Sequence, residues 1–199
     1  MTDKYKESHT AKAIFMRVRN EIPELLLFEH KVRKNTAKQK NGSEFKEKPR
    51  WGFSGGKVEE GESFVDAILR EVAEETLAED GTFLQLSPEM FSEELAVHGQ
   101  VKRSMREGND THQDHYYFAL LPSDTEIGKI RNDNEEIARG KYFTLDKIPT
   151  PDDTLPFTRN QLRGFVELLR HLRGKVENAD RWLATVEKWA YPYLIVRQS

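Results

Sequence analysis

Residues 55–75 contain the residue types that chemistry on phosphate groups requires. The stretch reads GGKVEEGESFVDAILREVAEE, and its spacing sets four carboxylates around one glycine loop and one helix: Glu62, Glu71, Glu74 and Glu75. Carboxylate oxygens are preferred ligands of Mg²⁺ and Mn²⁺, and a Mg²⁺ ion held in this way also engages substrate phosphates. The spacing therefore predicts a site that holds divalent cations against a phosphate chain.

A helix over residues 64–78 is expected to position these glutamates. Ser63 is a favourable N-cap residue, and Asp66 three positions later completes a capping-box pattern. Beyond it, residues recur at the spacing of one helical face: Val65, Ile68, Leu69, Val72 and Thr76. That face is expected to be buried, which directs the glutamates to the neighbouring side.

Three of the glutamates share one face of the predicted helix. Glu71, Glu74 and Glu75 stand at i, i+3 and i+4, where like charges destabilise a helix by roughly 0.2–0.5 kcal/mol per pair. A divalent cation would turn this repulsion into binding. Gly55 and Gly56 have no side chains, so the backbone before the helix can approach such an ion and a carbonyl can join its ligands.

Arg70 is placed to hold the glycine loop against the helix, because it can pair with a loop carboxylate such as Glu62. The alternative interpretation of the whole pattern is an acidic, solvated helix face after a flexible turn. Six specified residues from Gly56 to Glu75 argue against that alternative, since such a match arises by chance in about one chain per 10⁵ at average composition.

The stretch closely resembles the Nudix box, G-x5-E-x7-R-E-U-x-E-E-x-G-U, in which U is an aliphatic residue. The residues that match in register are Gly56, Glu62, Arg70, Glu71, Val72, Glu74 and Glu75. The flanking segments, Trp51-Gly52-Phe53 and NEEIARGKYFTLDKIP at 134–149, fit the family as well. The resemblance covers roughly residues 10–172. It implies an α/β fold in which a mixed β-sheet lies between helices, with a C-terminal helical extension.

The same resemblance implies a metal-dependent pyrophosphohydrolase. Such enzymes use Mg²⁺ or Mn²⁺ to cleave a nucleoside diphosphate linked to another moiety, as in a nucleotide sugar, ADP-ribose, a dinucleoside polyphosphate or a nucleoside triphosphate. The implied metal ligands are Glu71, Glu74, Glu75 and the carbonyl of Gly55. The implied structural residues of the box are Gly56, Glu62 and Arg70.

Two positions depart from the family pattern. Leu77 stands where the family has the glycine that ends the helix, so the helix is expected to run one further turn and stop at Gly81. Ser54 stands where many members have proline before the glycines. Both departures lie at the ends of the box, and neither removes a carboxylate.

A further acidic residue outside the box is expected to act as an additional ligand or as the general base. Glu136 is the best candidate, and the others are Glu135, Asp124 and Glu126. A general base must lie within hydrogen-bond reach of the proton that it takes. For each of these residues the alternative is an ordinary solvated loop acid.

Substrate contacts are expected from outside the box, with Trp51, Tyr117, Asp152 and Asp153 as candidates. Tyr116 and Tyr117 alternate along a strand, so one is expected to enter the core and the other to line the pocket. In some relatives of the mutator type, acids near Asp152 and Asp153 read a purine base. Acids at a helix entry need no such role, and that interpretation is preferred.

Two histidines in the motif THQDHYYF are weaker candidates. His112 and His115 could contact a phosphate or a leaving group. An imidazole needs a suitably placed partner for such a role, so ordinary histidines at a strand end are the favoured interpretation.

Hydrophobic patterning predicts the elements that must carry the site. Strands are expected at 11–18, 24–30, 91–103, 114–121 and 141–144, with a turn at 20–23. Two helices are expected at 159–173 and 178–190. The predicted Nudix hydrolase domain spans residues 1–175, and residues 176–199 form a helical extension that packs on it or on a partner, which makes a homodimer one expectation.

The segment 31–50 is a predicted basic insertion with eight Lys or Arg residues and two Glu residues. A basic loop beside an acidic metal site would suit a polyanionic substrate. The favoured alternative is a solvated loop without such a role.

Overall composition excludes several classes of protein. The chain of 199 residues contains no cysteine, so disulfides and thiolate sites are excluded. No apolar run approaches the ~20 residues that a membrane span needs, and the N-terminal residues lack an apolar signal core. A cytoplasmic protein without a membrane partner is expected. The net charge of −3 does not favour a nucleic-acid partner.

The alternative function is that of a non-catalytic Nudix-fold regulator that binds nucleotides or RNA. The basic segment 31–50 lends it some support. The intact set of helix glutamates argues against it, because a binding module does not need all three.

Overall fold

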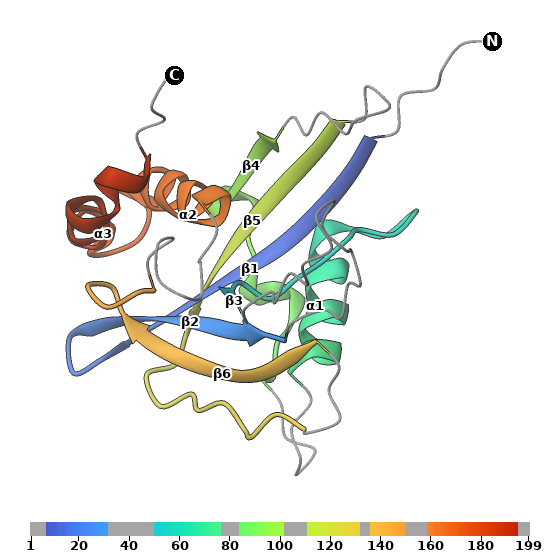
Figure 1. The fold of residues 1–199 in the computed structure, drawn as a ribbon, viewed down its shortest axis with the longest axis horizontal. Helices are drawn as coiled ribbons and strands as arrows, with labels where there is room; N and C mark the ends of the chain where they lie inside the picture. The colour runs from blue at the N-terminus through green and yellow to red at the C-terminus, as the bar shows by residue number, and fades with distance from the viewer. Residues whose placement is uncertain are drawn as a thin grey trace, which may run out of the picture.

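A mixed β-sheet with helices on both faces is the framework of the molecule (Figure 1). The computed structural model describes residues 7–31, 50–76, 84–101, 111–131, 136–149 and 159–194. Within these ranges the strands are β1 (Glu7–Arg19), β2 (Ile22–His30), β3 (Arg50–Gly52), β4 (Ala96–Val101), β5 (Thr111–Leu121) and β6 (Ile137–Thr144). The helices are α1 (Phe64–Glu75), α2 (Arg159–Leu172) and α3 (Ala179–Leu194). The predicted α/β fold is confirmed.

The order of strands in the sheet is β3-β2-β1-β5-β4, and β6 pairs with β2. The long central strands β1 and β5 run parallel, in register from Glu7 opposite Thr111 to Arg17 opposite Leu121, and lie side by side in Figure 1. The other pairings are antiparallel. Residues that are distant in the chain, before the box and after it, are thereby brought next to one another.

The β1–β2 hairpin closes through a two-residue turn. Asn20 and Glu21 both have positive φ angles, of 50° and 64°. Two left-handed residues in succession are typical of the type I′ turn, whose twist matches that of the flanking strands. The strands predicted at 11–18 and 24–30 are present and longer than expected. Pro23 belongs to β2 rather than to the turn.

The prediction of a continuous strand from residue 91 is wrong. Two short 3₁₀ turns, Pro88–Met90 and Glu93–Leu95, precede β4, which begins at Ala96. The hydroxyl of Ser92 accepts a hydrogen bond from the Glu94 amide at 3.2 Å. Such local hydrogen bonds from serine compete with strand pairing.

Helix α1 covers one face of the sheet. As predicted, Ser63 caps its N-terminus by accepting a hydrogen bond from the Asp66 amide at 3.1 Å. The buried residues Ala67, Ile68 and Val72 of α1 belong to the same apolar cluster as Phe15 and Phe28 of the sheet. Burying such side chains contributes about 1.5–3 kcal/mol for each large one, so this face anchors the helix that carries the glutamates.

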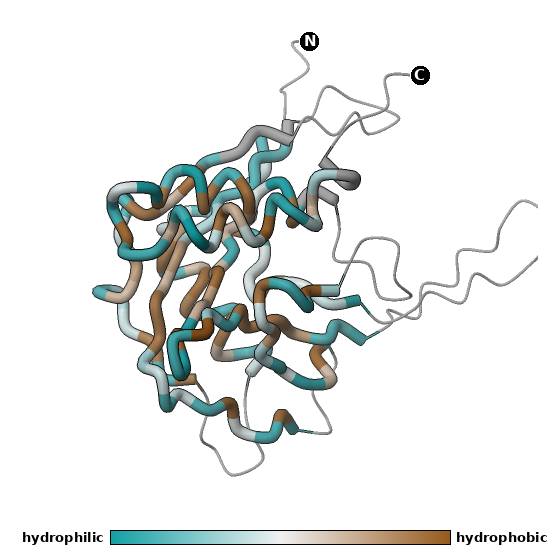
Figure 2. The backbone as a smooth tube through the Cα atoms, turned by 90° about the vertical axis from the view of Figure 1, so that its left-hand side faces the viewer, coloured by the Kyte–Doolittle hydropathy of each residue, from teal (hydrophilic) through white to brown (hydrophobic). Residues whose placement is uncertain are grey.

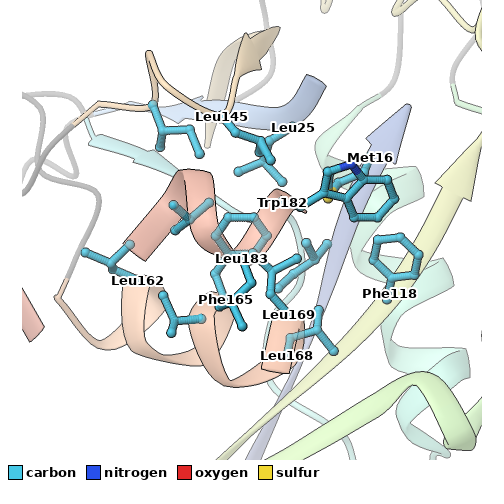
Figure 3. Packing of buried hydrophobic residues seen from close by; sticks show 14 of the residues in the cluster. Met16, Leu25, Phe118, Leu145, Leu162, Phe165, Leu168, Leu169, Trp182 and Leu183 are labelled. Carbon is cyan, nitrogen blue, oxygen red and sulfur yellow. The ribbon is translucent and has the colours of Figure 1, made fainter. Parts of the chain in front are cut away.

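Helices α2 and α3 cover the opposite face (Figures 1 and 3). Phe165 of α2 and Trp182 of α3 pack in one buried cluster with Met16 and Phe118 of the sheet. In Figure 2 the hydrophobic residues gather in the strands inside the molecule, whereas the helices and outer turns alternate between hydrophobic and hydrophilic residues. The C-terminal helix thus shares a core with the sheet, although the predicted domain boundary at 175 falls between α2 and α3.

Several residues singled out from the sequence lie outside the described ranges. They are most of the basic segment 31–50, together with Leu77, Gly81, Glu135, Asp152 and Asp153. In the part of the chain that the structure describes, no helix is long and apolar enough to span a membrane.

Candidate functional site

The glycine loop is fixed along β1 by backbone hydrogen bonds. The amides of Ala13 and Ala11 donate to the carbonyls of Ser54 and Gly56, and the Val58 amide donates to the His9 carbonyl, each at 3.0 Å. The loop therefore runs beside β1 much as a short antiparallel strand would. This pairing sets the position of the loop independently of its side chains.

The two glycines are required for different reasons. Gly55 has a φ of +125°, and a Cβ there would lie 2.2 Å from the backbone oxygen of Ala11. A Cβ on Gly56 would instead lie 2.4 Å from the carboxyl carbon of Glu71. Gly55 thus allows the loop to approach β1, and Gly56 leaves room for a carboxylate of α1.

Glu75 is a buried acid at the end of α1, only 5% exposed. Its Oε2 accepts hydrogen bonds from the Ser54 hydroxyl at 2.5 Å and from the Gly55 amide at 3.1 Å. Burial raises the pKa of Glu75 to about 7, and the two hydrogen bonds and nearby Lys12 only partly oppose this. A buried carboxylate that is poorly compensated by positive charge is a favourable ligand for a cation.

Arg70 joins the loop to the helix through several carboxylates. Its Nε and Nη2 donate to the two oxygens of Glu62 at 2.9 and 3.1 Å, which is the expected ion pair. Its Nη1 contacts Glu71 at 2.9 Å and lies 3.7 Å from Glu74. The guanidinium holds the pKa of Glu62 below its usual range. Arg70 also donates to the Lys57 carbonyl at 3.0 Å, so it closes the loop.

A groove of about 540 Å³ brings the two glycines and the glutamates of α1 together with residues from β1, β2, β3, α2 and the segment before β6. Its acidic lining comes from Glu71, Glu74, Glu75 and Glu136. Its remaining lining residues are Lys12, His30, Arg50, Trp51, Gly55, Gly56, Lys57 and Gln161. One wall can therefore bind cations, and the basic side chains beside it can bind anions.

Glu136 is the only one of the described acids proposed outside the box that lines this groove. It directly precedes β6, and its carbonyl accepts a hydrogen bond from the Lys31 amide at 2.6 Å. Glu126 lies elsewhere and pairs with Arg17 and Arg19 at 3.3 and 3.2 Å. Asp124 is exposed and does not line the groove.

Of the two aromatic candidates, only Trp51 lines the groove. Its ring packs edge-on against Phe143, with the ring centroids 4.9 Å apart. Tyr117 is fully buried on the α1 side, where its hydroxyl donates to Glu93 at 2.5 Å. Tyr116 is buried on the opposite face. The expectation that one of the tyrosines lines the pocket is therefore wrong, because both faces of β5 are covered.

Five polar residues that line the groove were not predicted as site residues, namely Lys12, His30, Arg50, Lys57 and Gln161. Lys12 left a signal, since it interrupts the apolar run AKAIFM of a central strand. His30 and Gln161 meet beside Gly52, where a Cβ would lie 3.1 Å from a nitrogen of each. They come from β2 and α2, and no local pattern joins them.

The histidines of β5 lie in hydrogen-bond networks at the strand ends instead of in the groove. His115 is buried, with its Nδ1 2.7 Å from His98 Nδ1 and its Nε2 3.0 Å from His9 Nδ1. The ring of Phe64 stacks on it at 3.9 Å. His112 contacts Ser8 at 2.8 Å and Asp114 at 3.2 Å. Burial, followed by the neighbouring His98 and His9, lowers the pKa of His115 to about 4.

This histidine cluster is expected to make stability depend on pH. Because the folded-state pKa of His115 lies below its ordinary value of 6.5, the neutral cluster contributes fully above pH 6.5 and its contribution is lost as the pH falls toward 4. Between pH 7 and pH 4 the free energy of unfolding of wild type should fall by about 3 kcal/mol more than that of His115→Gln, as one pKa unit corresponds to about 1.4 kcal/mol.

Urea denaturation of both proteins at pH 7, 6, 5 and 4 measures this difference. Subtracting the pH dependence of His115→Gln from that of wild type isolates the contribution of His115. If the free energy of unfolding changed equally with pH in the two proteins, burial would not lower the pKa of His115.

Comparisons with known proteins point to one family. A family model described as "NUDIX domain" matches residues 9–165. No curated protein matches the chain. Many solved structures do match it. A MutT/nudix family protein from Enterococcus faecalis has a TM-score of 0.54 and 18% identity, over 94% of this chain and 70% of that one.

A second similar structure is a bifunctional NMN adenylyltransferase/ADP ribose pyrophosphatase from Francisella tularensis, with AMP and a manganese ion bound. It has a TM-score of 0.54 and 16% identity. The match covers 83% of this chain but only 42% of that longer protein. At these identities the structural likenesses establish a shared fold.

Proposed function

We propose that this chain, which belongs to the NUDIX domain family, hydrolyses the pyrophosphate linkage of a nucleoside diphosphate derivative with Mg²⁺ or Mn²⁺. The observation that carries this proposal is the groove in which three helix carboxylates, Glu136 and the Gly55 backbone lie beside three basic side chains. A pyrophosphate carries enough negative charge to need both the cations and the basic residues.

The residues present fit a hard divalent cation. All candidate ligands are oxygen donors, which Mg²⁺ and Mn²⁺ prefer, and the buried Glu75 would gain from a nearby positive charge. Among the described residues, no three acidic or histidine side chains are already grouped as a metal site. Glu71 instead contacts Arg70. The proposal therefore requires Glu71 to leave Arg70 and bind the cation, while Glu75 stays in place.

In the proposed arrangement Glu71, Glu74 and Glu75, with the Gly55 carbonyl, hold the cation. When bound, it neutralises phosphate charge and lowers the pKa of coordinated water. Lys12, Arg50 and Lys57 bind the remaining phosphate oxygens. Glu136 is the proposed base that takes the proton of the attacking water, and Arg70 with Glu62 keeps the loop in place.

Trp51 is proposed to contact the nucleoside part of the substrate, because an aromatic ring on the groove wall can pack against a base. The Francisella protein is a bifunctional NMN adenylyltransferase/ADP ribose pyrophosphatase with AMP and a manganese ion bound. This supports including ADP-ribose in any panel of substrates.

A substrate panel tests the proposal. Purified protein is incubated with Mg²⁺ or Mn²⁺ and with nucleotide sugars, ADP-ribose, dinucleoside polyphosphates and nucleoside triphosphates, and the nucleotide products are separated by chromatography. Metal-dependent release of a nucleoside monophosphate or of pyrophosphate is expected for at least one substrate. Metal chelation should abolish it. Nucleotide binding without turnover across the panel would instead indicate a binding module.

Gly52→Ala is expected to raise KM by roughly 10-fold, the scale of one methylene group in a binding pocket. The new Cβ would press on His30 and Gln161 at 3.1 Å, and both line the groove without being proposed metal ligands. The value of kcat should change little, since no carboxylate moves. Steady-state kinetics on the best substrate measures both constants, and an unchanged KM would place the substrate elsewhere.

A further inference from the structure

Ser54 lies at the junction of the sheet and the metal-binding helix. The residue is fully buried. Its carbonyl accepts the Ala13 amide of β1 at 3.0 Å, while its hydroxyl donates to Glu75 of α1 at 2.5 Å. The backbone of Ser54 is thus tied to the sheet, and its side chain reaches the last turn of the helix.

The hydroxyl and a backbone amide converge on the same carboxylate oxygen. Oε2 of Glu75 accepts from Ser54 and also from the Gly55 amide at 3.1 Å. Two donors from adjacent residues define the plane of a carboxylate better than one, because hydrogen bonds at an sp² oxygen prefer particular directions. Hydrogen bonds to a charged acceptor are also stronger than those between neutral groups.

Glu75 differs in this respect from its neighbours on α1. Glu71 contacts Arg70, which also binds Glu62 and approaches Glu74. These partners are charged, partly exposed side chains. Glu75 accepts hydrogen bonds from a buried hydroxyl and from a main-chain amide. Its orientation is therefore built into the framework, whereas that of Glu71 depends on a long side chain.

We propose that Ser54 is a positioning residue that orients the Glu75 carboxylate and thereby strengthens divalent-cation binding. The inference rests on the proposed metal site. Groups that hold a metal ligand in place commonly change metal affinity or activity by about 10–100-fold when they are removed. Ser54 touches neither substrate nor metal in this arrangement and acts through Glu75 alone.

The test measures Mn²⁺ binding to metal-free protein by titration calorimetry or by the electron paramagnetic resonance signal of free Mn²⁺, without any substrate. Ser54→Ala should raise the Mn²⁺ dissociation constant by roughly 10-fold or more. Ser54→Thr keeps the hydroxyl and should restore affinity to within about threefold of wild type, a lower loss than removal of the group causes. Circular dichroism confirms that each variant is folded.

Ser63→Ala is the matched control. It removes another serine hydroxyl that bonds to the same helix, at the N-cap, and should lower thermal stability without changing the Mn²⁺ dissociation constant. Wild-type affinity in Ser54→Ala would overturn the proposal. Equal losses in the Ala and Thr variants would also overturn it, because the shape of the side chain and not its hydroxyl would then matter.

Glu75→Gln separates this inference from the proposed function. If Glu75→Gln loses Mn²⁺ affinity while Ser54→Ala keeps it, the metal site stands and the role of Ser54 fails. If Glu75→Gln binds Mn²⁺ as wild type does, the metal-site assignment itself fails, and the inference about Ser54 fails with it.

Discussion

Glu75→Gln should lower kcat/KM by roughly 10²–10³-fold, the scale seen when one group that stabilises transition-state charge is removed. The amide keeps the size of the side chain but removes the negative charge that the proposed cation requires. Glu75 is also buried, and the Ser54 hydroxyl and the Gly55 amide hold its carboxylate in place. Its loss therefore should not be compensated by movement of a neighbouring group.

Stability measurements distinguish this effect from misfolding. Burial raises the pKa of Glu75 to about 7, so above that pH the folded protein without metal contains an unfavourable buried charge. Glu75→Gln removes this charge, and the metal-free variant should be at least as stable as wild type at pH 8. Added Mn²⁺ should raise the melting temperature of wild type only, since a ligand stabilises the state that binds it.

Glu60→Gln is the matched control, because Glu60 is an exposed acid in the same loop. Its activity and its response to Mn²⁺ should equal those of wild type. An active Glu75→Gln enzyme with an ordinary Mn²⁺ response would remove Glu75 from the site.

Gly55→Ala should destabilise the protein by roughly 2–5 kcal/mol, combining strained backbone with overpacking. The φ of +125° disfavours any residue with a side chain, and the new Cβ would lie 2.2 Å from the Ala11 oxygen and 2.8 Å from the Lys12 Cα. Both are backbone atoms of a central strand, which cannot move aside. Urea denaturation at pH 7 gives the loss in free energy of unfolding.

Gly56→Ala provides the contrast within the same dipeptide. The three atoms nearest its Cβ would all belong to the carboxyl group of Glu71, the closest at 2.4 Å, and a side chain can move where a strand cannot. We expect a small loss of stability with a large loss of activity, because Glu71 is displaced. If both alanine variants lost stability equally and Gly56→Ala stayed active, the difference inferred between the two glycines would be wrong.

Local signals in the sequence predicted the local structure around α1 well. The N-cap at Ser63, the buried side of α1 at Ile68 and Val72 and the Arg70–Glu62 ion pair all involve residues within a few turns of one another. Helical periodicity and a short loop are enough to relate such residues. The type I′ turn and the paired strands of the first hairpin are likewise local.

Predictions failed where a residue's surroundings come from distant segments. Tyr117 alternates along β5 as expected, but whether that face meets solvent depends on α1, more than 40 positions earlier in the chain. Lys12, His30 and Gln161 enter the groove because β1, β2 and α2 converge there. Periodicity shows which residues share a face of an element, but it does not show what that face meets.

The opening stretch of glycines and glutamates by itself determined which donor groups the proposed site contains, because the three helix carboxylates and the loop before them lie close in the chain and helix geometry relates them. Only the tertiary structure decided how these groups are held and what lies opposite them. Backbone hydrogen bonds with β1 set the loop of Gly55 beside that strand, and the Ser54 hydroxyl reaches Glu75. Lys12 of β1 and Arg50 of β3 complete the groove. These contacts join residues whose distance depends on packing of the sheet against its helices, which no local spacing encodes.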